Sequence, residues 1–174
     1  MDRIMVIGPC GAGKSTAAAR LADITGLPLI HMDKLNWQPG WVETGNAELR
    51  AKVSAAAAGD SWIIEGNYGG TMELRLARAS CVLYLDYPIP LCLWRIVKRI
   101  LRYRGTTRPD MTEACEERFN LPFLWYVAGW RWGPGPRTEA KIKGHESKIV
   151  RLKSPAQLDE WMAQMITGRV SSVS

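Results

Sequence analysis

Residues 8–15, with the sequence GPCGAGKS, match the pattern GxxxxGK[ST] of a phosphate-binding loop. They follow a short apolar run and precede a helix-like segment, which is the context that the pattern requires. Glycine lets the backbone turn its N–H groups inward, and the next helix N-terminus adds partial positive charge for a bound phosphate. We expect Lys14 to reach the β- and γ-phosphates of ATP and the Ser15 hydroxyl to ligate Mg²⁺. The predicted nucleotide-binding residues of this segment are Gly8, Pro9, Cys10, Gly11, Ala12, Gly13, Lys14, Ser15 and Thr16.

Two acidic residues come directly after apolar, strand-like runs. Asp33 follows the run in "LIHMD", and Glu65 ends the run in "WIIE". The carboxyl ends of parallel strands line the ligand-binding edge of an open α/β sheet. At that edge Asp33 can accept a proton from an acceptor hydroxyl or hold a Mg²⁺-bound water, and Glu65 can bind Mg²⁺ through water. The alternatives are a helix-capping or turn role for Asp33 and a surface position for Glu65.

Several other residues are candidates for binding an anion. Arg75 can bind a phosphate or carboxylate of the acceptor by a bidentate pair, or it can be a solvated helix arginine. The segment "RIVKRILRYRGTTR", residues 95–108, holds six basic residues and no acid, so it can bind an anion or form a solvated basic face. The tryptophans at 125, 130 and 132 are expected to pack in a lid or a subunit contact, with base stacking as the alternative. His31 is either a hydrogen-bonded residue at a strand end or an acceptor contact.

The elements that must position these residues follow from the apolar pattern. Five short runs have strand length and little alternation of polarity, as expected for strands buried on both faces: residues 3–7, 27–31, 62–65, 81–85 and 149–152. Helix-like segments lie at residues 14–23, 43–58, 71–79, 89–103 and 156–165. Strands that alternate with helices predict right-handed crossovers and an α/β fold with a five-stranded parallel sheet. Residues 104–144, rich in proline and glycine, interrupt the alternation and predict an inserted lid.

Length and composition limit the class of protein. A chain of 174 residues, 47% hydrophobic and 23% charged, predicts one folded domain over residues 1–174. The first seven residues are too short for a signal peptide and no run approaches ~18 apolar residues, so we expect a cytoplasmic protein without membrane contact. The four cysteines lack the spacing of a disulfide framework or zinc site. The net charge of +6 fits anionic partners such as nucleotides or nucleic acid.

With these residues identified, the chain resembles the adenylate-kinase-like branch of P-loop kinases and, more closely, the bacterial topology-modulation proteins. The segments that carry the second resemblance are "LNWQPGW", "WIIEGNYGGTMELRLARAS", "YLDYP", "RGTTRPDM" and "CEERF". The resemblance implies a three-layer P-loop NTPase fold, an acceptor-binding segment at residues 34–60, and a lid at residues 104–144 that closes over ATP. By position, Arg99 resembles an arginine that packs over adenine, and Arg118 resembles a lid arginine that clamps phosphates during transfer. Residues 153–156, with Ser154 and Pro155, resemble the segment that lines the adenine pocket.

The departures from the nucleoside monophosphate kinases concern the acceptor. Those kinases usually carry an arginine in the acceptor segment and another four residues after the third-strand acid, whereas residues 34–60 hold only Arg50, and position 69 is glycine. Asp33 instead resembles the aspartate of kinases of small hydroxyl compounds, such as shikimate kinase. The aspartate usual in the "DGNY" segment is Glu65 here, which keeps the charge and lengthens the side chain. The residues expected to contact the acceptor are Asp33, Trp37, Asn67, Arg75 and Arg108.

These observations predict an ATP- and Mg²⁺-dependent phosphotransferase acting on a small molecule or a nucleotide. The predicted catalytic residues are Lys14, Asp33, Arg99 and Arg118, and the predicted metal ligands are Ser15 and, through water, Glu65. Two alternatives stay open: a nucleotide-gated protein that binds nucleic acid, and an ATPase without a small acceptor. The protein is expected to be a monomer or a homodimer.

Overall fold

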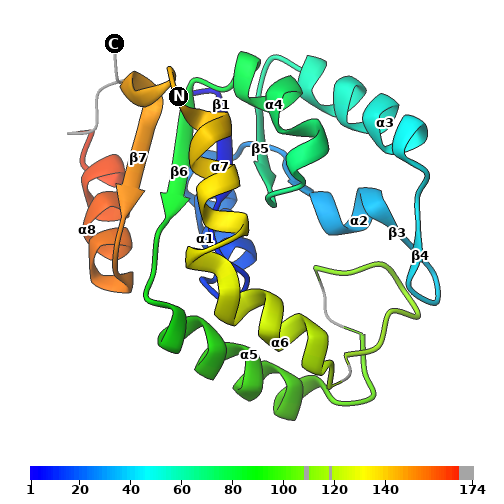
Figure 1. Cartoon of the computed structure of the whole chain (residues 1–174). Helices are drawn as coiled ribbons and strands as arrows, with labels where there is room; N and C mark the ends of the chain where they lie inside the picture. The colour runs from blue at the N-terminus through cyan, green and yellow to red at the C-terminus, as the bar shows by residue number, and fades with distance from the viewer. Residues whose placement is uncertain (108–109, 118, 169–174) are drawn as a thin grey trace.

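The computed structural model describes residues 1–107, 110–117 and 119–168, which form a central sheet with helices on both faces (Figure 1). Five parallel strands lie in the order β2-β5-β1-β6-β7. They are β1 Arg3–Ile7, β2 Leu29–His31, β5 Trp62–Glu65, β6 Cys81–Leu85 and β7 Ile149–Leu152. The predicted five-stranded parallel sheet is confirmed. Only β2 begins later than predicted, because Pro28 has no N–H to donate to a strand ladder.

The sheet separates two apolar cores, and alternate residues of β1 belong to each. Ile4 and Val6 contribute to the first core, whereas Met5 and Ile7 contribute to the second. The first core is closed by α1 Lys14–Thr25, α5 Ile89–Tyr103 and α8 Pro155–Ile166. The second is closed by α3 Asn46–Ala58, α4 Met72–Arg78 and α7 Pro134–Ile142. These cores hold the carboxyl ends of β1, β2, β5 and β6 in fixed positions.

The segment between β2 and α3 contains elements that were not predicted. It forms the short helix α2 Met32–Asn36 and the hairpin of β3 Trp37–Gln38 and β4 Val42–Glu43. The helix predicted from residue 43 begins at Asn46, because residues 42–44 turn back toward α2 and the Thr44 N–H donates to the Asn36 carbonyl at 2.7 Å. The predicted acceptor segment is therefore a helix, a hairpin and a helix.

The proline-rich segment after α5 also contains helices. These are α6 Leu121–Ala128 and α7, separated by a 3₁₀ turn at Gly129–Arg131. Prolines 122, 134 and 136 lie in the first turns of these helices, where a missing N–H breaks no helical hydrogen bond. Three of the prolines that led us to expect an inserted lid therefore lie at the beginnings of helices. Trp130 is buried, whereas Trp125 and Trp132 are mostly exposed.

The hairpin and the segment 112–116 are joined by four hydrogen bonds. The Gly40 N–H and the Trp41 indole donate to the carbonyls of Ala114 and Glu116, at 3.2 and 3.1 Å. The Thr112 hydroxyl and the Cys115 thiol donate to carbonyls of β3, at 2.6 and 3.4 Å. The predicted acceptor segment thus touches the predicted lid directly. Across the described part of the chain, no helix is long and apolar enough to cross a membrane.

Candidate active site

The phosphate loop joins β1 to α1 in a conformation that requires glycine. Gly8 has a φ of 142°, and a Cβ at this position would lie 2.4 Å from the Leu85 carbonyl oxygen of β6. The Lys14 ammonium donates to the carbonyls of Gly8 and Pro9, both at 3.1 Å. The lysine is therefore held over the loop, as the sequence pattern predicts for a group that binds phosphate. Thr16, the last predicted residue of this segment, is exposed in the first turn of α1.

Ser15 and Glu65 meet at the carboxyl end of β5. The Ser15 hydroxyl donates to Glu65 Oε1 at 3.2 Å, and His31 Nδ1 lies 2.9 Å from the same oxygen. Glu65 is only 3% exposed, so the alternative of a surface glutamate is wrong. His31 is a hydrogen-bonded residue at the end of β2, one of the two alternatives that the sequence left open. A hydroxyl and a carboxylate beside a phosphate loop are hard oxygen donors, and they fit Mg²⁺.

Asp33 lies in the first turn of α2, two residues after His31, the last residue of β2. The hydroxyl of Tyr68 donates to Asp33 Oδ1 at 2.6 Å. Burial raises the pKa of the Tyr68 phenol, and the Asp33 carboxylate raises it further, while a hydrogen bond with the Trp37 side chain lowers it. The structure thus brings together Asp33 and Trp37, two predicted acceptor residues, with Tyr68, which the sequence analysis missed. The signal that could have found Tyr68 is its position three residues after Glu65, in the same loop.

Asn67 and Arg75, also predicted to contact the acceptor, support the backbone. Both polar groups of the Asn67 side chain bond to Gly8: its oxygen accepts from the Gly8 N–H at 3.0 Å, and its nitrogen donates to the Gly8 carbonyl at 2.8 Å. Arg75 is fully buried, so the alternative of a solvated helix arginine is wrong. Its guanidinium donates to the carbonyls of Gly66 at 2.7 Å and Asn67 at 2.6 Å. Burial lowers the pKa of Arg75 to about 10.

Two arginines of α5, Arg95 and Arg99, differ in the groups that they contact. Arg95 donates to the Ala12 carbonyl of the phosphate loop at 3.0 Å, and its guanidinium lies 5.7 Å from the centre of the Tyr87 ring. Arg99, predicted to pack over adenine, forms an ion pair of 3.1 Å with Glu117 and lies over the Phe123 ring. Arg95 thus contacts the phosphate loop. From the sequence it was assigned only to a basic face. It lies one turn closer than Arg99 to the helix N-terminus, which is the signal that could have identified it.

The predicted adenine segment begins α8. The Ser154 hydroxyl accepts a hydrogen bond from the Gln157 N–H at 3.3 Å, and Pro155 is the first residue of the helix. This is the arrangement of a side-chain N-cap followed by proline. Arg108 and Arg118, predicted to contact acceptor and phosphate, lie outside the described residues.

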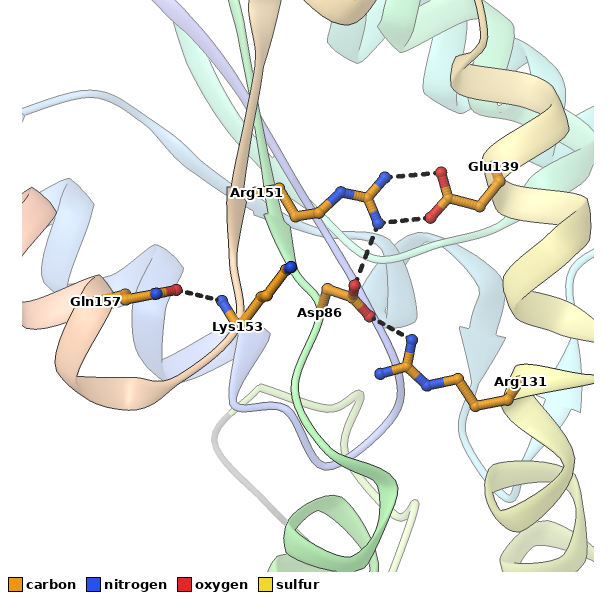
Figure 2. A network of polar contacts seen from close by, with 6 residues as sticks. All are labelled: Asp86, Arg131, Glu139, Arg151, Lys153 and Gln157. Atoms are coloured by element: carbon orange, nitrogen blue, oxygen red, sulfur yellow. Dashed lines mark hydrogen bonds and ion pairs between the residues drawn. The ribbon is translucent and has the colours of Figure 1, made fainter.

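A polar network lies next to this segment, centred on Asp86 at the end of β6 (Figure 2). Its carboxylate pairs with Arg131 at 3.0 Å and with Arg151 of β7 at 3.2 Å. Arg151 also forms a bidentate pair with Glu139 of α7, with both distances at 2.7 Å. Figure 2 shows Asp86 between the two arginines. The network fastens the segment after α6 to the edge of the sheet.

Comparison with known proteins finds matches among solved structures. No family model matches the chain, and no curated protein sequence does. Shikimate kinase from Acinetobacter baumannii, in complex with shikimate, matches with a TM-score of 0.56 and 18% identity, over 98% of this chain and 95% of that chain. A gluconokinase from Sinorhizobium meliloti matches with a TM-score of 0.58 and 18% identity, over 97% of this chain and 91% of that chain. A sugar kinase from Janibacter sp. matches with a TM-score of 0.55 and 20% identity, over 100% and 98% of the two chains. The chain therefore shares the α/β fold of these three kinases.

Proposed function

We propose that the protein is an ATP- and Mg²⁺-dependent kinase that transfers the γ-phosphate of ATP to a hydroxyl group of a small acceptor. The observation that carries this proposal is the partly buried contact of 3.2 Å between Ser15 and Glu65 at the phosphate loop, with Asp33 at the same edge of the sheet. Ser15 and Glu65 supply ligands for Mg²⁺, which would neutralise phosphate charge. Asp33 supplies a base. Together they make up the parts that phosphoryl transfer needs.

The proposed reaction is an in-line transfer. The backbone of the phosphate loop and Lys14 hold the β- and γ-phosphates, and Arg95 adds positive charge beside the loop. Asp33 accepts the proton of the acceptor hydroxyl as the hydroxyl oxygen bonds to the γ-phosphorus. The bond from that phosphorus to the oxygen of the β-phosphate breaks, and ADP leaves. Arg99, Arg118, Ser154 and Pro155 are proposed to contribute to the nucleotide side of the site.

The acceptor is proposed to be a hydroxyl compound rather than a nucleotide. Arg75, the arginine that the sequence offered for an acceptor phosphate, is fully buried and donates to backbone carbonyls. Asp33, by contrast, is bonded to the Tyr68 hydroxyl, which is the kind of group that a hydroxyl acceptor would offer. The structural neighbours named above are a shikimate kinase, a gluconokinase and a sugar kinase, which supports the same choice. The finer resemblance to topology-modulation proteins rests on the quoted sequence segments.

An acceptor screen tests this proposal. ADP release is measured with ATP, Mg²⁺ and a panel of shikimate, D-gluconate, neutral sugars, polyols, nucleosides and nucleoside monophosphates. We expect a hydroxyl compound to accelerate ADP release, and we expect Asp33→Asn to slow the accelerated rate by about 100- to 10,000-fold, which leaves a rate that can still be measured. Asp23→Asn, on the exposed face of α1, is the matched control. A protein that binds ADP by calorimetry but shows no acceleration by any compound would contradict the proposal and favour an ATPase without a small acceptor.

One surface supports a second candidate function, ATP-dependent binding of nucleic acid. On α5, the Lys98 ammonium lies 5.2 Å from the centre of the Trp94 ring, and the Arg102 guanidinium lies 5.4 Å from that of Tyr103. Trp94 is 59% exposed, so basic and aromatic groups meet solvent together. This candidate predicts duplex binding that weakens steeply with salt and requires ATP. Absence of binding at about 50 mM salt would eliminate it.

A further inference from the structure

The loop after β5 holds Tyr68 in an unusual backbone conformation. Tyr68 has a φ of 37° and a ψ of 67°, in the left-handed region that bulky residues rarely adopt. Such a conformation costs of the order of 1–3 kcal/mol and persists only where the surroundings enforce it. The loop must therefore contain contacts that hold this residue in place.

Those contacts come from the buried side chain of Arg75 and from Thr71. Arg75 donates to the carbonyls of the three successive residues 66–68, including that of Tyr68 at 3.4 Å. The N–H and the hydroxyl of Thr71 both donate to the Tyr68 carbonyl, at 3.0 and 3.2 Å. Burying a guanidinium completely costs desolvation free energy. Here the hydrogen bonds that offset this cost all go to the backbone of one short loop.

The result of this arrangement is the position of one hydroxyl group. The ring of Tyr68 packs beside Gly66, where a Cβ would lie 3.4 Å from the ring and 2.7 Å from Met32 of α2. The hydroxyl then reaches Asp33 Oδ1 at 2.6 Å, the length of a strong hydrogen bond to a charged oxygen. The raised pKa of the phenol keeps this group protonated at neutral pH, so it acts as the donor.

We infer that Tyr68 is the positioning residue of the acceptor site, and this inference rests on the kinase function proposed above. By holding Oδ1, the Tyr68 hydroxyl sets the rotation of the Asp33 carboxylate about its side-chain bonds. That rotation decides which direction Asp33 presents to the acceptor hydroxyl, and small errors in such geometry reduce turnover strongly. Arg75 acts one step further away, through the backbone that carries Tyr68.

Removal of the Tyr68 hydroxyl is expected to affect catalysis and to leave nucleotide binding nearly unchanged. Tyr68→Phe keeps the ring and the backbone but removes the hydroxyl, so Asp33 loses the hydrogen bond from Tyr68. We expect kcat with the acceptor found in the screen to fall about 10- to 100-fold, as for loss of a hydrogen bond to a charged group. The KM for ATP and the Kd for ADP are expected to change less than about twofold, because among the described residues the phenol donates to Asp33 rather than to the phosphate loop.

Tyr87→Phe is the matched control. Tyr87 is a buried tyrosine, and its hydroxyl has no hydrogen-bond partner within the described part of the chain. The control variant is expected to retain the wild-type kcat. Thermal unfolding is measured on every variant. If Tyr68→Phe only lost stability, its melting temperature would fall, but its kcat would not fall selectively while its KM for ATP stayed unchanged.

The double variant Asp33→Asn/Tyr68→Phe completes the test. If Tyr68 acts through Asp33, the double variant is no slower than Asp33→Asn alone. Additive losses, or a Tyr68→Phe kcat within about twofold of the wild type, would overturn the role of Tyr68 while leaving the kinase function in place. A wild-type protein that no acceptor accelerates would overturn the kinase function and, with it, the role of Tyr68.

Discussion

The Ser15 hydroxyl donates a hydrogen bond of 3.2 Å to Glu65, so the phosphate loop and the neighbouring strand share one buried carboxylate. The two residues are 50 positions apart in the sequence. They meet because β1 and β5 are adjacent parallel strands, and the phosphate loop returns over their carboxyl ends. His31, from the far side of β5, completes the set around the same oxygen.

Glu65→Gln is expected to weaken Mg²⁺ binding. The amide keeps the size of the side chain but loses its charge, and removing a group that acts through a metal-bound water typically costs 10- to 100-fold in metal affinity. Calorimetric titration of Mg²⁺ into the ADP-loaded protein measures this change without an acceptor. Glu73→Gln, an exposed residue paired with Arg50, is the control and should bind Mg²⁺ like the wild type. Equal Mg²⁺ affinity for Glu65→Gln and wild type would remove Glu65 from the metal site.

Gly8→Ala is expected to destabilise the fold. The new methyl group would meet the Leu85 carbonyl at 2.4 Å, and the φ of 142° is strained for any side chain. We expect a loss of at least about 2 kcal/mol in the free energy of unfolding, measured by urea denaturation. Gly129→Ala is the control. The φ of Gly129 is −77°, and a Cβ added there would meet no neighbouring atom within 4 Å, so this variant should be as stable as the wild type or slightly more stable.

Arg75→Lys is expected to reduce stability rather than acceptor affinity. Lysine keeps the charge but cannot reach three carbonyls at once, which leaves buried acceptors unsatisfied at a cost of about 2–3 kcal/mol. Arg78→Lys on the same helix alters an exposed arginine and should change the free energy of unfolding by less than about 0.5 kcal/mol. An Arg75→Lys protein of wild-type stability with a raised acceptor KM would show that Arg75 binds the acceptor instead.

The pair of Glu139 and Arg151 predicts a pH dependence of stability. The hydrogen bonds from Arg151 hold the pKa of Glu139 below its ordinary value of 4.5. A carboxyl with a lowered pKa stabilises the folded state above its unfolded pKa, and this contribution is lost as the pH falls through the folded pKa. The melting temperature of Glu139→Gln should therefore lie below that of the wild type at about pH 7, and the gap should narrow below about pH 4. Glu43→Gln, at an exposed position, should show no such gap; a Glu139→Gln gap independent of pH would contradict the pairing.

The sheet could be predicted from the sequence because its strands are buried on both faces. Burial makes each strand a continuous apolar run, and the helices between the runs impose parallel order. The helices α6 and α7 were hidden by prolines, since proline ends a helix in its interior but begins one in its first turn. Composition alone does not separate these two positions.

The backbone conformation of the phosphate loop could be predicted from the sequence, whereas the side-chain contacts of the loop after β5 could not. The phosphate loop is local, so its residue types define its geometry. The orientations of the Arg75 and Asn67 side chains depend on how residues 66–71 fold over the sheet. Both side chains form hydrogen bonds with backbone groups. Tyr68 is the last residue of the segment that corresponds to "DGNY", but that likeness assigns its side chain no role, and its left-handed conformation depends on contacts from a helix that follows it.

The four hydrogen bonds between the β3–β4 hairpin and residues 112–116 have a thermodynamic consequence. A ligand that moves one of these segments must move the other or break the bonds between them. For the proposed kinase, nucleotide and acceptor are then expected to act as heterotropic effectors of each other, each changing the affinity of the other by the same factor. Calorimetry of ADP with and without the acceptor measures that factor, which a truncated hairpin should bring to one.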